Sequence, residues 1–143
     1  MKYVTWENVG IDRIGCAWLI RRFVDPNAQF TFIPHGSTSI PAEAQAFDIP
    51  GAKLSHHQGH CSFHAMLREF KLTSDPILNR IARIIDEADT VQEATLEPAA
   101  QGLDLLCTGL RLTSPDDQTA LDRGQVIYDA LYAALSRATT PKA

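Results

Sequence analysis

The chain has 143 residues, of which 45% are hydrophobic and 21% charged, so it has the composition of a soluble globular protein and we expect a single domain over residues 1–143. Its formal net charge of −4 argues against strong nucleic-acid binding, which needs an excess of Lys and Arg to displace counterions from phosphates. No segment has the character of a signal peptide or the length of a membrane span, so we expect a cytoplasmic protein without membrane contact.

The first fifty residues predict a small sheet with one helix. Residues 2–6, KYVTW, are rich in β-branched and aromatic side chains and predict a short strand. Residues 12–24 have apolar side chains at helical spacing and predict a helix, with Asp12 placed to cap its N-terminus. Two more strands are predicted at 30–34 and 46–50, because each short apolar run ends in a proline.

The rest of the chain predicts helices, each with its own start signal. Ser62 is placed to cap the first of them. Asp75 and Pro76 form a capping pair for the second, and Pro98 can open the third. The segment 114–117, SPDD, combines a capping Ser, a proline and acids that suit the start of the last helix. The prediction is an α+β fold: a small N-terminal sheet with a helix, followed by a mainly helical C-terminal half.

The three cysteines are an odd number at wide spacings, so they do not predict a disulfide framework. Cys16 and Cys107 lie on apolar helical stripes, where a free thiol packs as a small hydrophobic group. Cys61 lies on no such stripe. It therefore stays a candidate for metal binding or for nucleophilic chemistry, with a neighbouring His as the activating group.

Residues 54–67, LSHHQGHCSFHAML, contain a cluster of soft donors: His56, His57, His60, Cys61 and His64. Imidazole and thiolate are the usual protein ligands of Zn²⁺ and of other borderline divalent metals. We therefore expect a divalent transition metal here, with Zn, Mn, Fe and Ni not distinguishable. No HExxH or CxxC pattern is present, and the alternative is a loop of solvent-exposed histidines.

The second predicted helix in this half ends in Asp86, Glu87 and Asp89, at the negative end of its dipole, where carboxylates are disfavoured. A cation should offset them. Arg80 or Arg83 on the same helix can do so, and the alternative is a metal ion shared with the histidine cluster across a short turn. The candidate metal ligands are therefore His56, His57, Cys61, His64, Asp86 and Asp89.

The first helix adds a candidate anion site. Backbone N–H groups at a helix start, aided by an arginine, can bind an oxyanion, so Arg13 and Arg21 are candidate contacts. The alternative is an ordinary helix start with solvated arginines.

Five segments together resemble the C-terminal domain of ChrB-type chromate resistance proteins. They are, in chain order, IDRIGCAWLIRRFVDP (11–26), AFDIPGAKLSH (46–56), CSFHAML (61–67), ARIIDEADT (82–90) and GQVIYDALYAAL (124–135). The resemblance runs along nearly the whole chain. It implies an accessory or regulatory part in chromate resistance beside a chromate efflux transporter, with chromate or another oxyanion as a candidate partner. Longer members add an N-terminal regulatory or rhodanese-like region, so the resemblance carries over neither DNA-binding regulation nor sulfur transfer to this chain.

The chain departs from the pattern of the family that it resembles at two candidate ligands, His64 and Asp86, where family members often have an Asp and a His. If the two positions face each other, a carboxylate and an imidazole have changed places.

The leading hypothesis is a non-catalytic metal-binding domain with an accessory or sensory role. Two alternatives stay open: a small metal- or Cys-dependent enzyme acting on an oxyanion or redox substrate, and a partner-binding domain without a metal. The sequence also leaves a homodimer open.

Overall fold

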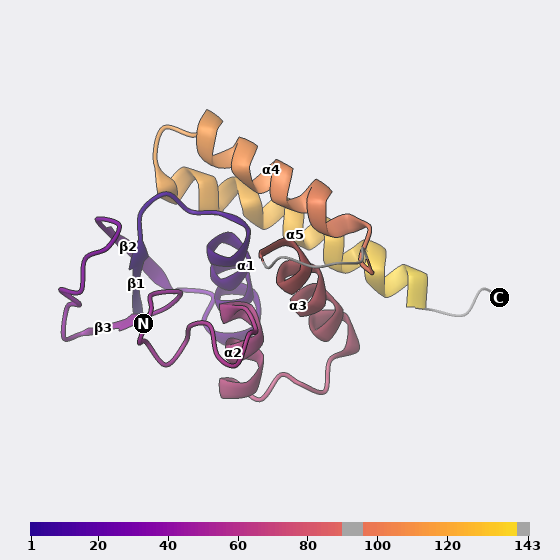
Figure 1. Cartoon of the computed structure of the whole chain (residues 1–143), viewed down its shortest axis with the longest axis horizontal. Coiled ribbons are helices and arrows are strands. Elements are labelled where there is room, and N and C mark those ends of the chain that lie inside the picture. The colour runs from indigo at the N-terminus through magenta and orange to yellow at the C-terminus, as the bar shows by residue number, and fades with distance from the viewer. Residues whose placement is uncertain (90–95, 140–143) are drawn as a thin grey trace.

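The computed structural model describes residues 1–89 and 96–139, so residue 90, the last of the segment 82–90, lies outside the described residues. In chain order the elements are β1 (Lys2–Trp6), α1 (Ile11–Leu19), the π-helical turn η1 (Ile20–Val24), β2 (Gln29–Ile33), β3 (Ala44–Ala46), α2 (Ser62–Glu69), α3 (Pro76–Asp89), α4 (Ala99–Thr113) and α5 (Asp117–Thr139). Figure 1 shows the sheet at one end of the molecule and the helices beyond it. The predicted α+β fold is confirmed.

The three strands are parallel and lie in the order β2-β1-β3. Lys2 of β1 is opposite Gln29 on one side and Ala44 on the other. The segments that follow β1 and β3 therefore leave the sheet at the same edge. Because β2 and β3 lie on opposite sides of β1, this edge is a place where strand order reverses, and parallel sheets form ligand sites at such places.

Helix α1 lies in the core because nearly all of its side chains are apolar, and a helix that is hydrophobic all round is buried. It lies between the sheet and the other helices (Figure 1). Trp18 of α1 stacks on Phe63 of α2 and on Tyr128 of α5. The Tyr128 hydroxyl donates a 2.7 Å hydrogen bond to the carbonyl of Ile11. These contacts hold α1 in place, and its first turn contains Asp12 and Arg13.

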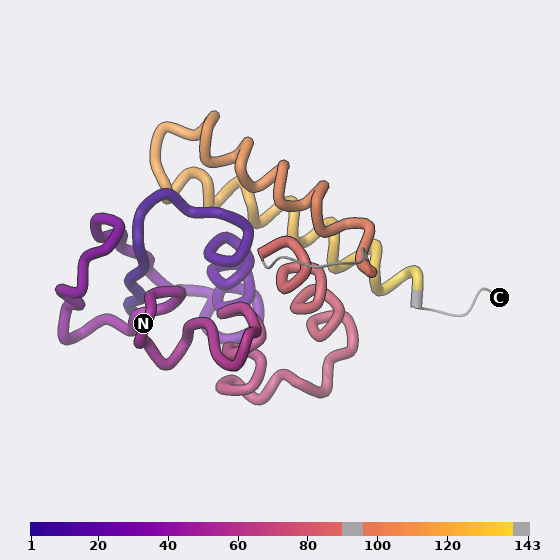
Figure 2. Tube along the Cα trace, viewed as in Figure 1, coloured from indigo at the N-terminus to yellow at the C-terminus, as the bar shows by residue number. Residues whose placement is uncertain are grey.

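Helices α4 and α5 run antiparallel along the far side of the molecule, as Figure 2 shows. The thiols of Cys16 and Cys107 are fully buried, which confirms their predicted place in the core. Among residues 1–89 and 96–139, no helix is long and apolar enough to cross a membrane.

Two of the predicted helix caps are wrong because the carboxylate that caps α2 comes from another helix. Gly10, not Asp12, is the N-cap of α1, and Asp12 lies inside its first turn. Ser62 is the first helical residue of α2. Its backbone N–H and that of Phe63 donate to the Asp12 carboxylate, at 2.8 and 3.0 Å.

Of the other two predicted caps, one is correct and one is wrong. Asp75 caps α3 as predicted, since its Oδ1 accepts the N–H groups of Ile77 and Leu78. At the start of α5 the predicted Ser114 cap is wrong, because the carboxylate of Asp116 accepts the Thr119 N–H at 2.8 Å. An acid two positions later in SPDD has taken the place of the serine.

Candidate metal site

The site lies at the edge of the sheet where β1 and β3 end. Asp12 follows β1 through a turn that contains Asn8, and Asp48 follows β3 directly. Asn8 and Asp48 have φ angles of 65° and 51°, in the left-handed region that Asn and Asp tolerate better than most residues. These two turns bring the Asp12 and Asp48 side chains to the same edge.

His56 is positioned by a tight turn that comes just before α2. His57 and His60 exchange backbone hydrogen bonds of 3.2 and 2.9 Å. Between them Gln58 and Gly59 have φ angles of 52° and 79°, and two positive values are the mark of a type I′ turn, in which glycine is favoured. The turn directs the chain into α2 and leaves His56 facing Asp12.

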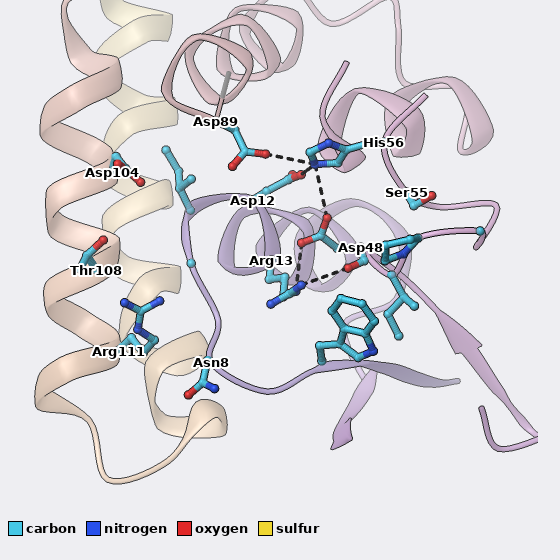
Figure 3. A pocket seen from close by; sticks show the side chains of 16 residues that line it. Asn8, Asp12, Arg13, Asp48, Ser55, His56, Asp89, Asp104, Thr108 and Arg111 are labelled. Atoms are coloured by element: carbon cyan, nitrogen blue, oxygen red, sulfur yellow. Dashed lines mark hydrogen bonds and ion pairs between the residues drawn. The ribbon is translucent and has the colours of Figure 1, made fainter. Parts of the chain in front are cut away.

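Three carboxylates surround one nitrogen of His56 (Figure 3). The His56 Nε2 atom lies 3.1 Å from Asp12 Oδ2, 3.1 Å from Asp89 Oδ2 and 3.6 Å from Asp48 Oδ1. The donor atoms of Asp12, His56 and Asp89 all lie within 4.8 Å of one another. A single ring N–H can donate well to only one of these oxygens, whereas a cation can be shared by all of them. Imidazole with carboxylates is a donor set that suits a divalent transition metal.

Asp12 is buried, with only 4% of its surface exposed, and its carboxylate is held by hydrogen bonds. Both of its oxygens accept backbone N–H groups at the start of α2, where the helix dipole favours a negative charge. Its Oδ2 thus contacts both the Ser62 N–H and His56. The hydrogen bonds to the start of α2 therefore also hold the Asp12 carboxylate in place beside His56.

The electrostatics of the site favour a cation. The pKa of His56 is raised to about 9 by its hydrogen bond to Asp12 and by the charges of Asp12, Asp48 and Asp89. The pKa of Asp48 is raised to about 7 by burial and by the charge of Asp12, which outweigh the Ser62 hydroxyl and Arg13. Burial and the charge of Asp12 also raise the pKa of Asp89. A divalent cation would relieve the repulsion among these carboxylates.

The acid-rich end of α3 faces the histidine cluster. Of the predicted ligands, His56 and Asp89 are brought together with Asp12. Asp86 lies one turn away, where its Oδ2 is 3.1 Å from Nδ1 of His60 and its Oδ1 accepts the Cys61 N–H at 2.6 Å. Arg80, one of the two arginines of the same helix that could have offset these acids, forms an ion pair with Glu97 instead, at 3.4 Å.

The other three predicted ligands point elsewhere. The His57 ring bonds the carbonyl of Lys53 at 2.7 Å and, with His64, lines a separate surface pocket. The His64 ring stacks on His60 with 4.2 Å between centroids, and burial and the charge of His60 lower its pKa. The Cys61 thiol is buried and lies 3.7 Å from the carbonyl of Ala82, and burial raises its pKa.

A pocket of about 570 Å³ opens beside the candidate metal site. Arg13 lines it, but its guanidinium is already engaged: Nε lies 3.0 Å from Asp48 Oδ2 and another nitrogen donates to the Asp48 carbonyl at 3.3 Å. Arg21, the other candidate oxyanion contact, lies outside this pocket. It pairs with Asp122 of α5 at 2.9 Å and stacks over Phe30.

Sequence reasoning missed three residues of this region. It assigned Asp12 to helix capping and gave no role to Asp48 or Arg111, which also lines the pocket. Asp12 could have been found from the predicted strand 2–6, because acids that follow neighbouring parallel strands meet at one edge of the sheet. Asp48 could not, because the strand predicted at 46–50 is wrong in its bounds: β3 is Ala44–Ala46, so Asp48 follows the strand instead of lying inside it. No comparable local signal marks Arg111.

Comparison with known proteins finds matches in sequence along nearly the whole chain. The family model of the ChrB C-terminal domain matches residues 3–135. The protein ChrB of Cupriavidus metallidurans is 33% identical to this chain over 135 residues, which are 94% of the chain and 41% of that protein. The chain therefore spans about two fifths of the length of this relative. No solved structure matches it.

Proposed function

Because the chain belongs to the family of the ChrB C-terminal domain, we propose that it has an accessory or sensory role in chromate resistance. We further propose that it performs this role with one divalent transition metal ion, bound by Asp12, His56 and Asp89. Membership of the family supports the first statement, and the geometry of the site supports the second.

One observation is the main support for metal binding: the His56 Nε2 atom lies 3.1 Å from a carboxylate oxygen of Asp12 and 3.1 Å from one of Asp89. The donor set of one imidazole and two carboxylates, with the Asp48 carboxylate close by, contains no thiolate. Such a set suits Mn²⁺, Fe²⁺, Ni²⁺ or Zn²⁺ and gives no preference for Cu⁺, which thiolates select.

The three ligands belong to three different parts of the fold. Binding of an ion could therefore change how firmly these parts are held together, which is what a sensor of the ion needs. Asp12 is on α1, His56 is on the loop before α2, and Asp89 is the last residue of α3. A bound ion would tie these elements together and would stabilise the folded chain by mass action. Metal occupancy would therefore control how firmly the end of α3 is held to the rest of the fold.

The test is metal titration of chelator-stripped protein with Mn²⁺, Fe²⁺, Ni²⁺ and Zn²⁺ in turn. We expect about one ion per chain for at least one metal, and stabilisation of about 2.7 kcal/mol at a hundredfold excess over Kd. His56→Ala and Asp89→Asn should lose both effects. His57→Ala is the matched control, because its ring bonds a backbone carbonyl outside the site.

Failure of all four metals to bind, or unchanged binding by His56→Ala, would overturn the metal assignment. The same pair tests the cellular role. In cells that depend on this protein for chromate tolerance, His57→Ala should restore tolerance and His56→Ala should not.

A metal-dependent enzyme is the second candidate function, because the site opens onto the 570 Å³ pocket and catalytic metal sites keep a position open for substrate. The Cys61-dependent enzyme has no such support, since the thiol is 1% exposed and belongs to the core.

A further inference from the structure

The pocket beside the metal site has two ends of different chemistry. Asp12, His56 and Asp89 line one end, and α4 supplies the opposite wall through Asp104, Thr108 and Arg111. These α4 residues are spaced i, i+4 and i+7, so they share one face of the helix. Figure 3 shows them along the pocket side of α4, across from Asp12 and Arg13. A ligand in the pocket would therefore contact the metal site and α4 at the same time.

Arg111 is a cation of this wall that has no counterion in the part of the chain that the structure describes, residues 1–89 and 96–139. Its side chain is half-buried, and among residues 1–89 and 96–139 it makes no hydrogen bond or ion pair. Arg13, on the other wall, is tied to Asp48. The planar fork of donors of the Arg111 guanidinium matches a carboxylate or a phosphate. An anionic ligand would supply the missing partner.

The size and the lining of the pocket favour an organic ligand over a bare inorganic ion. A volume of about 570 Å³ lies within the range of roughly 300–1,000 Å³ that small organic molecules occupy in proteins. Trp6, Ile49 and Pro50 give the sheet side of the pocket an apolar surface. An inorganic oxyanion has no apolar part that could cover it.

We propose that this pocket binds a small organic anion whose charged oxygens pair with Arg111 and whose other end reaches the metal ion. The inference rests on the proposed function, because the carboxylates of Asp12, Asp48, Asp89 and Asp104 would repel an anion if no divalent ion offset their charge. Binding of the anion and of the metal should therefore strengthen each other, by the reciprocity that couples two ligands of one protein.

The experiment is calorimetric titration of the metal-loaded protein with malonate, succinate and glutarate, and with inorganic phosphate and chromate, at constant ionic strength. Two variants accompany the wild type. Arg111→Gln removes the charge from the pocket, and Arg83→Gln is the matched control, since Arg83 is an exposed arginine of α3 outside the pocket. Metal content is measured in each protein.

We expect at least one dicarboxylate to bind the metal-loaded wild type more tightly than phosphate and chromate do. Arg111→Gln should weaken the affinity for this dicarboxylate at least tenfold with unchanged metal content. Arg83→Gln should change the affinity less than twofold.

If the metal binds but no dicarboxylate does, or if Arg111→Gln binds as the wild type does, this inference fails and the proposed function stands. Tighter binding of phosphate or chromate would overturn the organic nature of the ligand. A wild type that takes up no metal would overturn both the proposed function and the inference.

Discussion

Asp12 caps a helix to which it does not belong: its Oδ2 accepts the backbone N–H of Ser62, the first residue of α2, at 2.8 Å. The same oxygen lies 3.1 Å from the His56 imidazole. One carboxylate thus supports the fold and faces the candidate metal. Its removal should affect both, whereas removal of the other acidic ligand should affect the metal alone.

In metal-free protein, Asp12→Ala should lower the free energy of unfolding by about 1–3 kcal/mol, because the N–H groups of Ser62 and Phe63 lose their buried acceptor. Asp89→Ala should change it by less than about 0.5 kcal/mol, since this carboxylate lies at the end of α3 and is partly exposed. Urea denaturation with a chelator present measures both. Equal losses would show that Asp12 has no special structural role.

The contrast between the caps formed by Asp75 and by Asp12 shows which parts of the fold can be predicted from the sequence. Most strand and helix positions follow from local sequence patterns, although β3 is Ala44–Ala46 and not the predicted 46–50. The Asp75 cap was predicted correctly because its partners, Ile77 and Leu78, are its neighbours in sequence. The partners of Asp12 are 50 and 51 residues away. Nothing local distinguishes a carboxylate that caps its own helix from one that caps another.

The candidate site shows a similar limit. The density of His and acidic residues correctly indicated that the end of α3 faces the segment before α2, and both His56 and Asp89 were among the predicted ligands. The spacing of the histidines in that segment could not show which of them faces Asp89. His57 follows His56 by one residue, yet its ring faces the Lys53 carbonyl because the type I′ turn begins there.

The stability of metal-free protein should fall as pH rises from about 6 to 9. The folded pKa of His56 is about 9, above its ordinary value of 6.5, so its contribution is fully present below pH 6.5 and is lost as pH rises through 9. The pKa of Asp48, raised from 3.8 to about 7, has the same sign, with its contribution lost as pH rises through 7.

Thermal unfolding at a series of pH values, with a chelator present, measures this slope. His56→Gln should flatten it most at the alkaline end of this range, near the His56 pKa of about 9, where Asp48 with its pKa of about 7 is already largely deprotonated. A bound metal should remove the slope as well, because it takes the place of the proton on His56 and offsets the carboxylates. A wild-type midpoint that rises between pH 7 and 9 in the chelator would contradict the arrangement of charges around His56.

The three thiols should be unreactive in the native protein. Cys16, Cys61 and Cys107 are at most 1% exposed, and burial raises the pKa of each, so almost no thiolate is present at neutral pH. Ellman's reagent should therefore detect three thiols only after denaturation. Cys61→Ala should also keep the metal stoichiometry of the wild type. Rapid reaction of one native thiol would revive the Cys61-dependent enzyme.

Gly124 of α5 allows the close approach of α5 to α1, on which Asp12 stands. A Cβ at this position would lie 2.2 Å from Ile14 Cγ2, and Ile14 is completely buried. A β-branched side chain is stiff at χ1, so it cannot turn away and the helices must separate. Gly124→Ala should therefore lower the free energy of unfolding by about 1–3 kcal/mol, the usual effect of overpacking.

The matched control is Gly102→Ala on α4, where a Cβ would meet no atom within 4 Å. This change should raise the free energy of unfolding by about 0.5–1 kcal/mol, because alanine loses less backbone freedom than glycine on helix formation. Denaturant titration of the two variants under the same conditions gives the comparison. A Gly124→Ala protein as stable as the wild type would mean that α5 does not pack on Ile14 as described, and the position of α1 would then need another support.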